Sequence, residues 1–283
     1  MIHGYKVTQQ GEYHKKHNLV CQDFGSFNIV SDKVAIAAVA DGLGSELYTD
    51  VAAQLAVECV LKYCEEHLSD ETDYKDVISH AFREAWKTVV QQASSDGNDI
   101  GEYDTTLVTV IFKDGTVYYG NSGDSGIVVL NMDGKYHPLT EQQRDENGCV
   151  FPLCFEDKWV FGEEKDVSSV LLATDGMYET LFPYLLKGEP EEIYVALAQF
   201  MMDGRSLGYG EKSDDQIQEM MDDFVANLDK QQVTDDKTIL LLYDDSVELD
   251  RQPDEYYAVP DWDVLKQKHD EEFKKQAYPH MYK

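Results

Sequence analysis

Apolar residues in this chain occur in two patterns, short continuous runs and longer segments with helical spacing. The clearest run, residues 34–40 (VAIAAVA), carries no charge and predicts a strand that is buried on both faces. It leads into residues 41–45 (DGLGS), where Asp41 is followed by Gly42. Because glycine has no side chain, backbone atoms and ligands can approach the carboxylate closely. An ordinary Asp-Gly turn is the alternative interpretation.

Several other segments have the length and composition of strands. The turns 113–115 (KDG) and 133–134 (DG) each lie between two such segments, a pattern typical of β-hairpins. Strands joined by short turns run antiparallel. The predicted strands are residues 5–9, 27–31, 106–112, 116–120, 126–130, 159–161, 169–174 and 238–243, with a short one that ends near Leu139.

Helical spacing of apolar residues marks two pairs of segments. The first pair begins at Thr49 or Asp50 and at Thr72 or Asp73, whose side chains can cap a helix. The second pair is predicted at about residues 190–202 and 216–228. The order of a helix pair, antiparallel strands and another helix pair predicts an α+β protein whose sheets lie between helices.

The last part of the chain differs in composition from the rest. Residues 246–283 are acidic and aromatic, are interrupted by proline, and contain one predicted helix at residues 262–273. We therefore divide the chain of 283 residues into a domain at 1–245 and an extension at 246–283. We expect the extension to pack on the domain, with binding to a partner as the alternative.

Charge and cysteine content narrow the classes of function. The formal net charge is −31, which disfavours binding to nucleic acid or to an anionic membrane surface. The five cysteines form an odd number, and the N-terminus lacks the apolar core of a signal peptide. No apolar run is long enough to cross a bilayer. We expect reduced thiols and a monomeric, cytoplasmic protein.

Acidic residues recur where predicted strands end or begin. If these carboxylates converge, two of them about 4 Å apart repel by about 4 kcal/mol at an effective dielectric constant of about 20. Convergence therefore implies a cation, and an all-oxygen set indicates magnesium or manganese rather than zinc. The alternative is that they are separate surface turns. The residues are Asp23, Asp41, Asp124, Asp175 and Asp235.

The order of these motifs resembles the metal-dependent type 2C (PPM) serine/threonine protein phosphatases in their short bacterial form. The resemblance covers about residues 3–245. It implies a four-layer α/β/β/α sandwich of two antiparallel sheets flanked by helix pairs, with a metal pair at one end. The motifs are Cys21-Gln22-Asp23, the turn at 41–45, Gly123-Asp124-Ser125, residues 175–179 (DGMYE) and residues 235–238 (DDKT).

The resemblance also implies a role for each acidic residue. Asp41 should bridge two Mn²⁺ or Mg²⁺ ions, and the carbonyl of Gly42 should bind one of them. Asp175 and Asp235 should hold the other ion, with Asp23 nearby through water. A weaker third ion would lie at Asp124 and Glu179, and Thr105 and Thr106 would have structural roles.

Three positions depart from the family pattern. Many members carry a phosphate-binding arginine shortly before the first acidic motif, where this chain has Asn18 and its neighbours. We expect His14 or Lys16 to contact the phosphate, with a solvated basic turn as the alternative. Leu43 stands where several members place a histidine as general acid, so His14 or metal-bound water would protonate the leaving group. Gly126 replaces an arginine often found after Gly-Asp-Ser.

The resemblance implies direct hydrolysis of phosphoserine or phosphothreonine in proteins by a hydroxide that bridges the metals. No cysteine or serine nucleophile motif stands out, in agreement with that chemistry. The main alternative is a signalling or interaction protein that keeps the fold with little activity. A metal-dependent phosphodiesterase for small molecules is a third interpretation.

Overall fold

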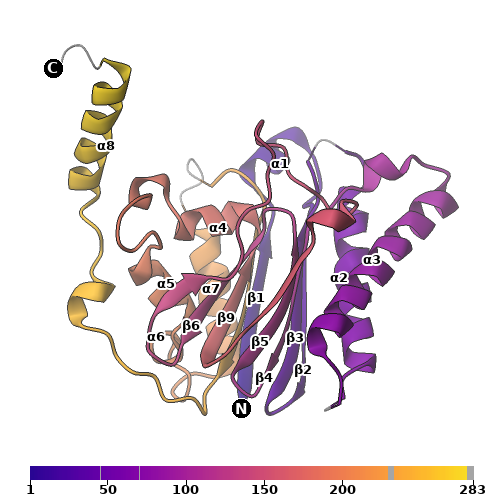
Figure 1. Cartoon of the computed structure of the whole chain (residues 1–283), viewed down its shortest axis with the longest axis horizontal. Coiled ribbons are helices and arrows are strands. Elements are labelled where there is room, and N and C mark those ends of the chain that lie inside the picture. Colours follow the sequence, from indigo (N-terminus) through magenta and orange to yellow (C-terminus); the bar gives the residue numbers. More distant parts are fainter. Residues whose placement is uncertain (45, 70, 229–232, 279–283) are drawn as a thin grey trace.

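Two antiparallel sheets packed face to face form the centre of the molecule (Figure 1). The computed structural model describes residues 1–44, 46–69, 71–228 and 233–278. One sheet has the order β1 (Ile2–Gln9), β10 (Lys237–Asp244), β9 (Val167–Ala173), β6 (Gly126–Asn131) and β7 (Tyr136–Pro138). The other has the order β2 (Asp23–Ser31), β3 (Val34–Asp41), β4 (Leu107–Lys113), β5 (Thr116–Ser122) and β8 (Val160–Glu164).

Helices cover the outer face of each sheet. The pair α2 (Thr49–Glu66) and α3 (Tyr74–Asp96) shares a buried cluster with the β2–β8 sheet. On the other side, α4 (Asp175–Leu181), α5 (Val195–Met202), α6 (Gly204–Leu207) and α7 (Asp214–Ala226) cover the β1–β7 sheet. A third cluster lies between the sheets. The predicted four-layer α/β/β/α sandwich is therefore confirmed.

Strand β3 shows how the sequence produces these layers. Its residues 35–40 are completely buried. Ala35, Ala37 and Val39 lie in the cluster between the sheets, whereas Ile36, Ala38 and Ala40 lie in the cluster under α2 and α3. Side chains alternate across a strand, so a strand with both faces covered needs apolar residues throughout.

Two short helices, which carry His14 and Asp175, are absent from the elements predicted from the sequence. Residues Glu12–His17 form α1, although the segment is polar and only His14 is buried in it. The Asp175-Gly176 step begins α4 instead of forming a turn. The helix expected at 190–202 begins only at Val195. Helix α1 was not predicted because it has only one buried side chain, and apolar periodicity cannot reveal such a helix.

The extension contacts the domain at two places. Leu249, Tyr256 and Tyr257 pack against the cluster on the β1–β7 sheet, and the backbone N–H of Tyr136 donates to the Tyr256 hydroxyl at 3.0 Å. Helix α8 (Trp262–Ala277) then projects from the body beside η3 (Tyr184–Leu186) (Figure 1). Among the described residues, no helix combines the length and apolarity of a membrane span.

Candidate metal centre

Five aspartates come together where strands and helices end. Asp23 begins β2 and lies opposite Asp41, the last residue of β3, in the antiparallel register. Asp175 is the first residue of α4, Asp124 lies in the turn between β5 and β6, and Asp235 precedes β10. Elements that are distant in sequence therefore contribute to one acidic site.

The centre of the site is compact. One carboxylate oxygen from each of Asp41, Asp124 and Asp175 lies within 4.8 Å of the others. Asp124 is buried, and the other two are partly buried. Side-chain oxygens of this kind, brought together from three elements, can ligate a hard divalent cation.

Threonines fix the two strands that carry Asp23 and Asp41. The backbone N–H of Asp41 donates to Thr106 Oγ1 at 2.9 Å, and Thr105 Oγ1 donates to the Asp41 carbonyl at 3.1 Å. Thr174 Oγ1 donates to Asp23 Oδ2 at 2.7 Å. These contacts support the structural roles expected for Thr105 and Thr106, since both hold the backbone of Asp41.

The pKa values show that the cluster is electrostatically unfavourable by itself. Burial is the main cause that raises the pKa of Asp41 well above its ordinary value, and the charges of Asp23 and Asp175 add to it. Burial also raises the pKa of Asp23, although the Thr174 hydrogen bond opposes the shift. For Asp124, burial and Asp175 raise the pKa to about 6. A bound cation would remove this repulsion.

Gly42 and Gly126 are required by close packing. A Cβ at Gly42 would lie 2.6 Å from Cβ of Thr49, at the start of α2. A Cβ at Gly126 would lie 2.1 Å from the ring of Tyr178 on α4. The absence of an arginine at position 126 therefore has a steric reason, because the tyrosine occupies the space.

Arg144 lies among the acidic residues and was not found by sequence reasoning. Its Nη2 atom is 2.6 Å from Asp124 Oδ2, 3.3 Å from Asp175 Oδ2 and 3.6 Å from Glu179 Oε1. The contact with Asp124 is an ion pair to a buried oxygen, for which the described residues offer no hydrogen bond of ideal geometry. Arg144 lies in an irregular loop without a motif, and only a search for cations near Asp124 in space could have found it.

His14 lies beside the acidic site, held by a residue that sequence reasoning also missed. Its Nδ1 atom is 2.7 Å from Oδ2 of the buried Asp236. The backbone N–H groups of Gly11 and Gln22 both donate to the same carboxylate at 2.6 Å. A Cβ at Gly44 would lie 3.9 Å from His14 Nε2. The imidazole is thus fixed next to the turn that contains Leu43.

Lys16 is not brought to the acidic site in the same way. It is exposed on α1, and among the described residues no contact joins it to the carboxylates. Glu179 lies one turn after Asp175 on α4 with a largely exposed side chain, and partial desolvation beside the protein surface, with the charge of Asp175, raises its pKa. Ser45, part of the predicted 41–45 motif, lies outside the described residues.

Residues 10–234 match the sequence profile of one family, described as Protein phosphatase 2C. The chain belongs to the protein phosphatase 2C family. Membership confirms the resemblance found in the sequence motifs and makes the chain a metal-dependent serine/threonine phosphoprotein phosphatase. A comparison with curated proteins gives no match.

Solved structures of bacterial phosphatases share the fold at low sequence identity. The serine/threonine phosphatase Stp1 from Staphylococcus aureus is 15% identical, with a TM-score of 0.60, 86% of this chain covered and 95% of that one. The catalytic domain of the serine/threonine phosphatase PstP, in complex with two manganese ions, is 17% identical, with a TM-score of 0.57 and coverage of 86% and 97%. A bacterial serine phosphatase is 14% identical, with a TM-score of 0.60 and coverage of 89% and 100%.

Proposed function

We propose that Asp41, Gly42, Asp175 and Asp235 hold two Mn²⁺ or Mg²⁺ ions, with Asp23 as a nearby carboxylate, and that the substrates are phosphorylated proteins. The single observation that carries this proposal is the convergence of Asp41, Asp124 and Asp175 within 4.8 Å. The donor set fits the ions, since carboxylate oxygens are their preferred ligands. The catalytic domain of PstP is in complex with two manganese ions, which supports the same number here.

The ions compensate charge that the protein leaves unpaired. The raised pKa values of Asp23 and Asp41 reflect burial and repulsion between neighbouring carboxylates. When bound, divalent ions neutralise these carboxylates and activate water for attack on phosphorus. Asp41 and Asp175 hold their positions because β3 and α4 are fixed to the sheets, so the site is organised before substrate binds.

Arg144 takes the place that the family resemblance assigns to a third ion. That subsite consists of Asp124 and Glu179, and the guanidinium contacts both, as well as Asp175. A permanently charged guanidinium neutralises carboxylates as a cation does, without any requirement for free metal. We therefore expect two ions under ordinary conditions and a third only when Arg144 moves away.

His14 protonates the leaving serine or threonine oxygen. The Asp236 carboxylate orients Nδ1, so that Nε2 faces the turn after Asp41, where several family members carry a histidine. Leu43 cannot donate a proton. His14, which belongs to α1, therefore supplies the proton at the place where those family members use the histidine. Phosphate binding by His14 or Lys16 is a second role that we propose for this segment, and the position of His14 favours it over the exposed Lys16.

The carboxylate set opposes the alternative of an inactive interaction protein, since every acidic position is present.

We also propose that the protein acts as a monomer in the cytoplasm and without nucleic-acid or membrane partners, in keeping with the −31 charge and with five free cysteines.

The test is release of phosphate from a phosphoserine peptide with and without Mn²⁺. We expect activity only with the metal, and loss on the order of a hundredfold or more in Asp41→Asn. Asp114→Asn, in an exposed turn away from the site, is the matched control and should retain activity. A wild-type protein that binds Mn²⁺ and releases no phosphate from peptides would contradict the proposal.

A further inference from the structure

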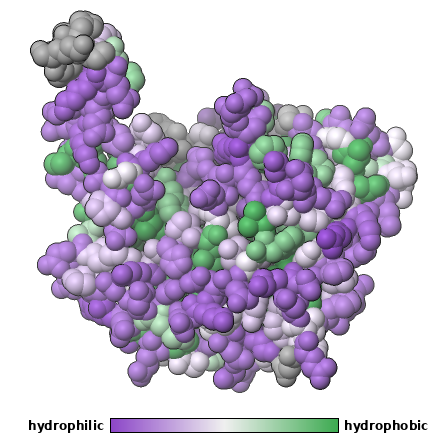
Figure 2. Space-filling model, viewed as in Figure 1, coloured by the Kyte–Doolittle hydropathy of each residue, from purple (hydrophilic) through white to green (hydrophobic). Residues whose placement is uncertain are grey.

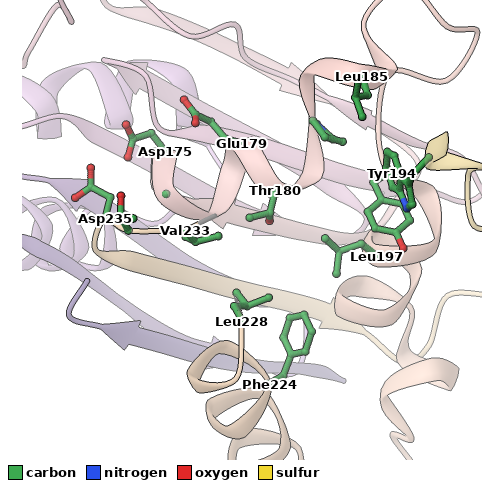
Figure 3. Close-up of a pocket in the computed structure, with 14 residues that line it drawn as sticks. Asp175, Glu179, Thr180, Leu185, Tyr194, Leu197, Phe224, Leu228, Val233 and Asp235 are labelled. Carbon is green, nitrogen blue, oxygen red and sulfur yellow. The ribbon is translucent and has the colours of Figure 1, made fainter. Parts of the chain in front are cut away.

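A large cavity opens next to the acidic site. Its volume is about 790 Å³, within the size range of ligand sites and ample for a large side chain together with the peptide backbone that carries it. Asp175 and Glu179 of α4 and Asp235 before β10 line one end (Figure 3). The cavity therefore shares residues with the metal centre.

The rest of the cavity is lined mainly by apolar side chains from several elements. Leu185 comes from η3, Tyr194 and Leu197 from just before and within α5, and Phe224 and Leu228 from the last turn of α7 and just after it (Figure 3). Among the described lining residues there is no lysine, arginine or histidine. The apolar part thus favours an uncharged, apolar occupant, because a charged group of either sign would lose water there without meeting an opposite charge.

The extension supplies part of the wall. Trp262, the first residue of α8, lines the cavity and meets the ring of Tyr194 edge-on, with ring centroids 5.1 Å apart. Further contacts hold α8 at this position: Lys268 pairs with Glu189, and His269 Nε2 lies 3.2 Å from the carbonyl oxygen of Leu185. The matched family profile ends at residue 234, so this wall lies outside it.

Continuity with the metal centre indicates what the cavity binds. A phosphoserine or phosphothreonine whose phosphate lies at Asp41 and Asp175 belongs to a polypeptide that must continue away from the carboxylates. The cavity begins at Asp175, so a neighbouring substrate residue can enter it directly. The visible face of the molecule is mostly hydrophilic (Figure 2), and the net charge of −31 disfavours acidic residues beside the phosphorylated one.

We propose that this cavity binds an apolar side chain of the phosphoprotein substrate, close in sequence to the phosphorylated residue, and that Trp262 contributes to this selectivity. The inference rests on the proposed metal centre, since the phosphate must bind there. The extension is then a specificity element of the phosphatase, in addition to a segment that packs on the domain.

A set of phosphoserine peptides tests this proposal. One leucine is moved through the positions on each side of the phosphoserine in a serine-rich background, and the same positions are tested with aspartate. For each protein, kcat/KM on a peptide is divided by its own kcat/KM on p-nitrophenyl phosphate. We expect leucine at one position to raise the ratio by about tenfold over serine, and aspartate there to lower it.

Variants of α8 provide the comparison. In Trp262→Ala the normalised kcat/KM for the leucine peptide should fall to about that for the serine peptide. Trp262→Phe should keep most of the difference between the two peptides. Phe273→Ala is the matched control, because this aromatic residue of α8 is 69% exposed and does not line the cavity, so it should behave as the wild type. Equal ratios for all peptides in the wild type, or a full preference in Trp262→Ala, would overturn the proposal.

The experiment also distinguishes an error in the proposed phosphatase activity from an error in the cavity assignment. If the wild type hydrolyses neither the peptides nor p-nitrophenyl phosphate, the proposed activity is wrong. The cavity is then tested by calorimetric binding of the leucine and serine phosphopeptides. The cavity assignment is supported if the wild type binds the leucine peptide more tightly than the serine peptide and Trp262→Ala loses this difference. Equal affinity of the wild type for the two peptides would overturn it.

Discussion

Arg144 contacts three carboxylates at the place where the family resemblance expects a weakly bound ion. The guanidinium cannot lose its charge at ordinary pH, so it offers permanent compensation to Asp124, Asp175 and Glu179. A metal ion at this subsite would have to displace the side chain. Affinity for that ion is therefore governed by competition with a residue of the protein itself.

Replacement of Arg144 should change metal binding. We expect Arg144→Ala to bind an additional Mn²⁺, with an affinity at this subsite about tenfold higher than in the wild type, because a competing cation is removed. Calorimetry and electron paramagnetic resonance of free Mn²⁺ would count the ions. Lys158→Ala, which removes a cation from the same connection between β7 and β8, should leave the count unchanged. If Arg144→Ala binds the same number of Mn²⁺ ions as the wild type, Arg144 does not compete with a metal ion at this subsite.

His14 has a buried partner that distinguishes it from the other basic residues of α1. Asp236 accepts two backbone hydrogen bonds as well as its contact with the imidazole, so the pair is rigid. A fixed imidazole near the leaving oxygen suits proton donation, whereas Lys16 is exposed.

Removal of His14 should affect substrates according to their leaving group. We expect His14→Ala to lower kcat about a hundredfold on a phosphoserine peptide and far less on p-nitrophenyl phosphate, whose leaving group needs no proton. Lys15→Ala, on the same helix, is the control. Equal losses on both substrates would indicate a purely structural role. A double variant with alanine at His14 and Lys16 and an unchanged KM would exclude phosphate binding by either residue.

At the scale of elements, the strands were predictable, and short helices such as α1 and α4 were not. Residues 34–40 could be assigned because both faces of β3 are covered, so the run is apolar throughout. The Asp175-Gly176 step looks like a turn in the sequence. In the structure Gly176 begins α4, and a Cβ there would lie 2.2 Å from the carbonyl oxygen of Asp236. Such a tertiary approach leaves no local pattern.

Contact between β6 and α4 gives a prediction about stability. Gly126→Ala would place a methyl group into the Tyr178 ring, so we expect the free energy of unfolding to fall by about 2 kcal/mol. Urea denaturation would measure the change. The control is Gly101→Ala, where the nearest atom to the added Cβ is Asp99 Oδ1, 3.6 Å away, and the loss should stay below about 0.5 kcal/mol. Equal stability of both variants would show that Tyr178 can move aside.

At the scale of the whole molecule, the site is assembled from Asp23 to Asp235, across most of the domain. The sequence predicted the group of Asp23, Asp41, Asp124, Asp175 and Asp235 because each stands next to a predicted strand or a glycine, and the motif order indicated the family. Arg144 has no such mark, and the role of Asp236 depends on its contact with His14, which only the tertiary structure shows. Arg144 reaches the site because its loop is anchored beside Gly123, where the N–H of Gln143 donates to the glycine carbonyl at 3.0 Å.

Distribution of the three tryptophans gives the molecule a built-in optical probe. Trp86 and Trp159 pack against the cluster under α2 and α3, whereas Trp262 stands at the cavity beside Tyr194. Indole emission depends on the polarity around the ring, so an occupant of the cavity alters the signal of Trp262 and leaves the other two in their apolar surroundings. Substrate recognition can thus be followed in the unlabelled protein, separately from turnover.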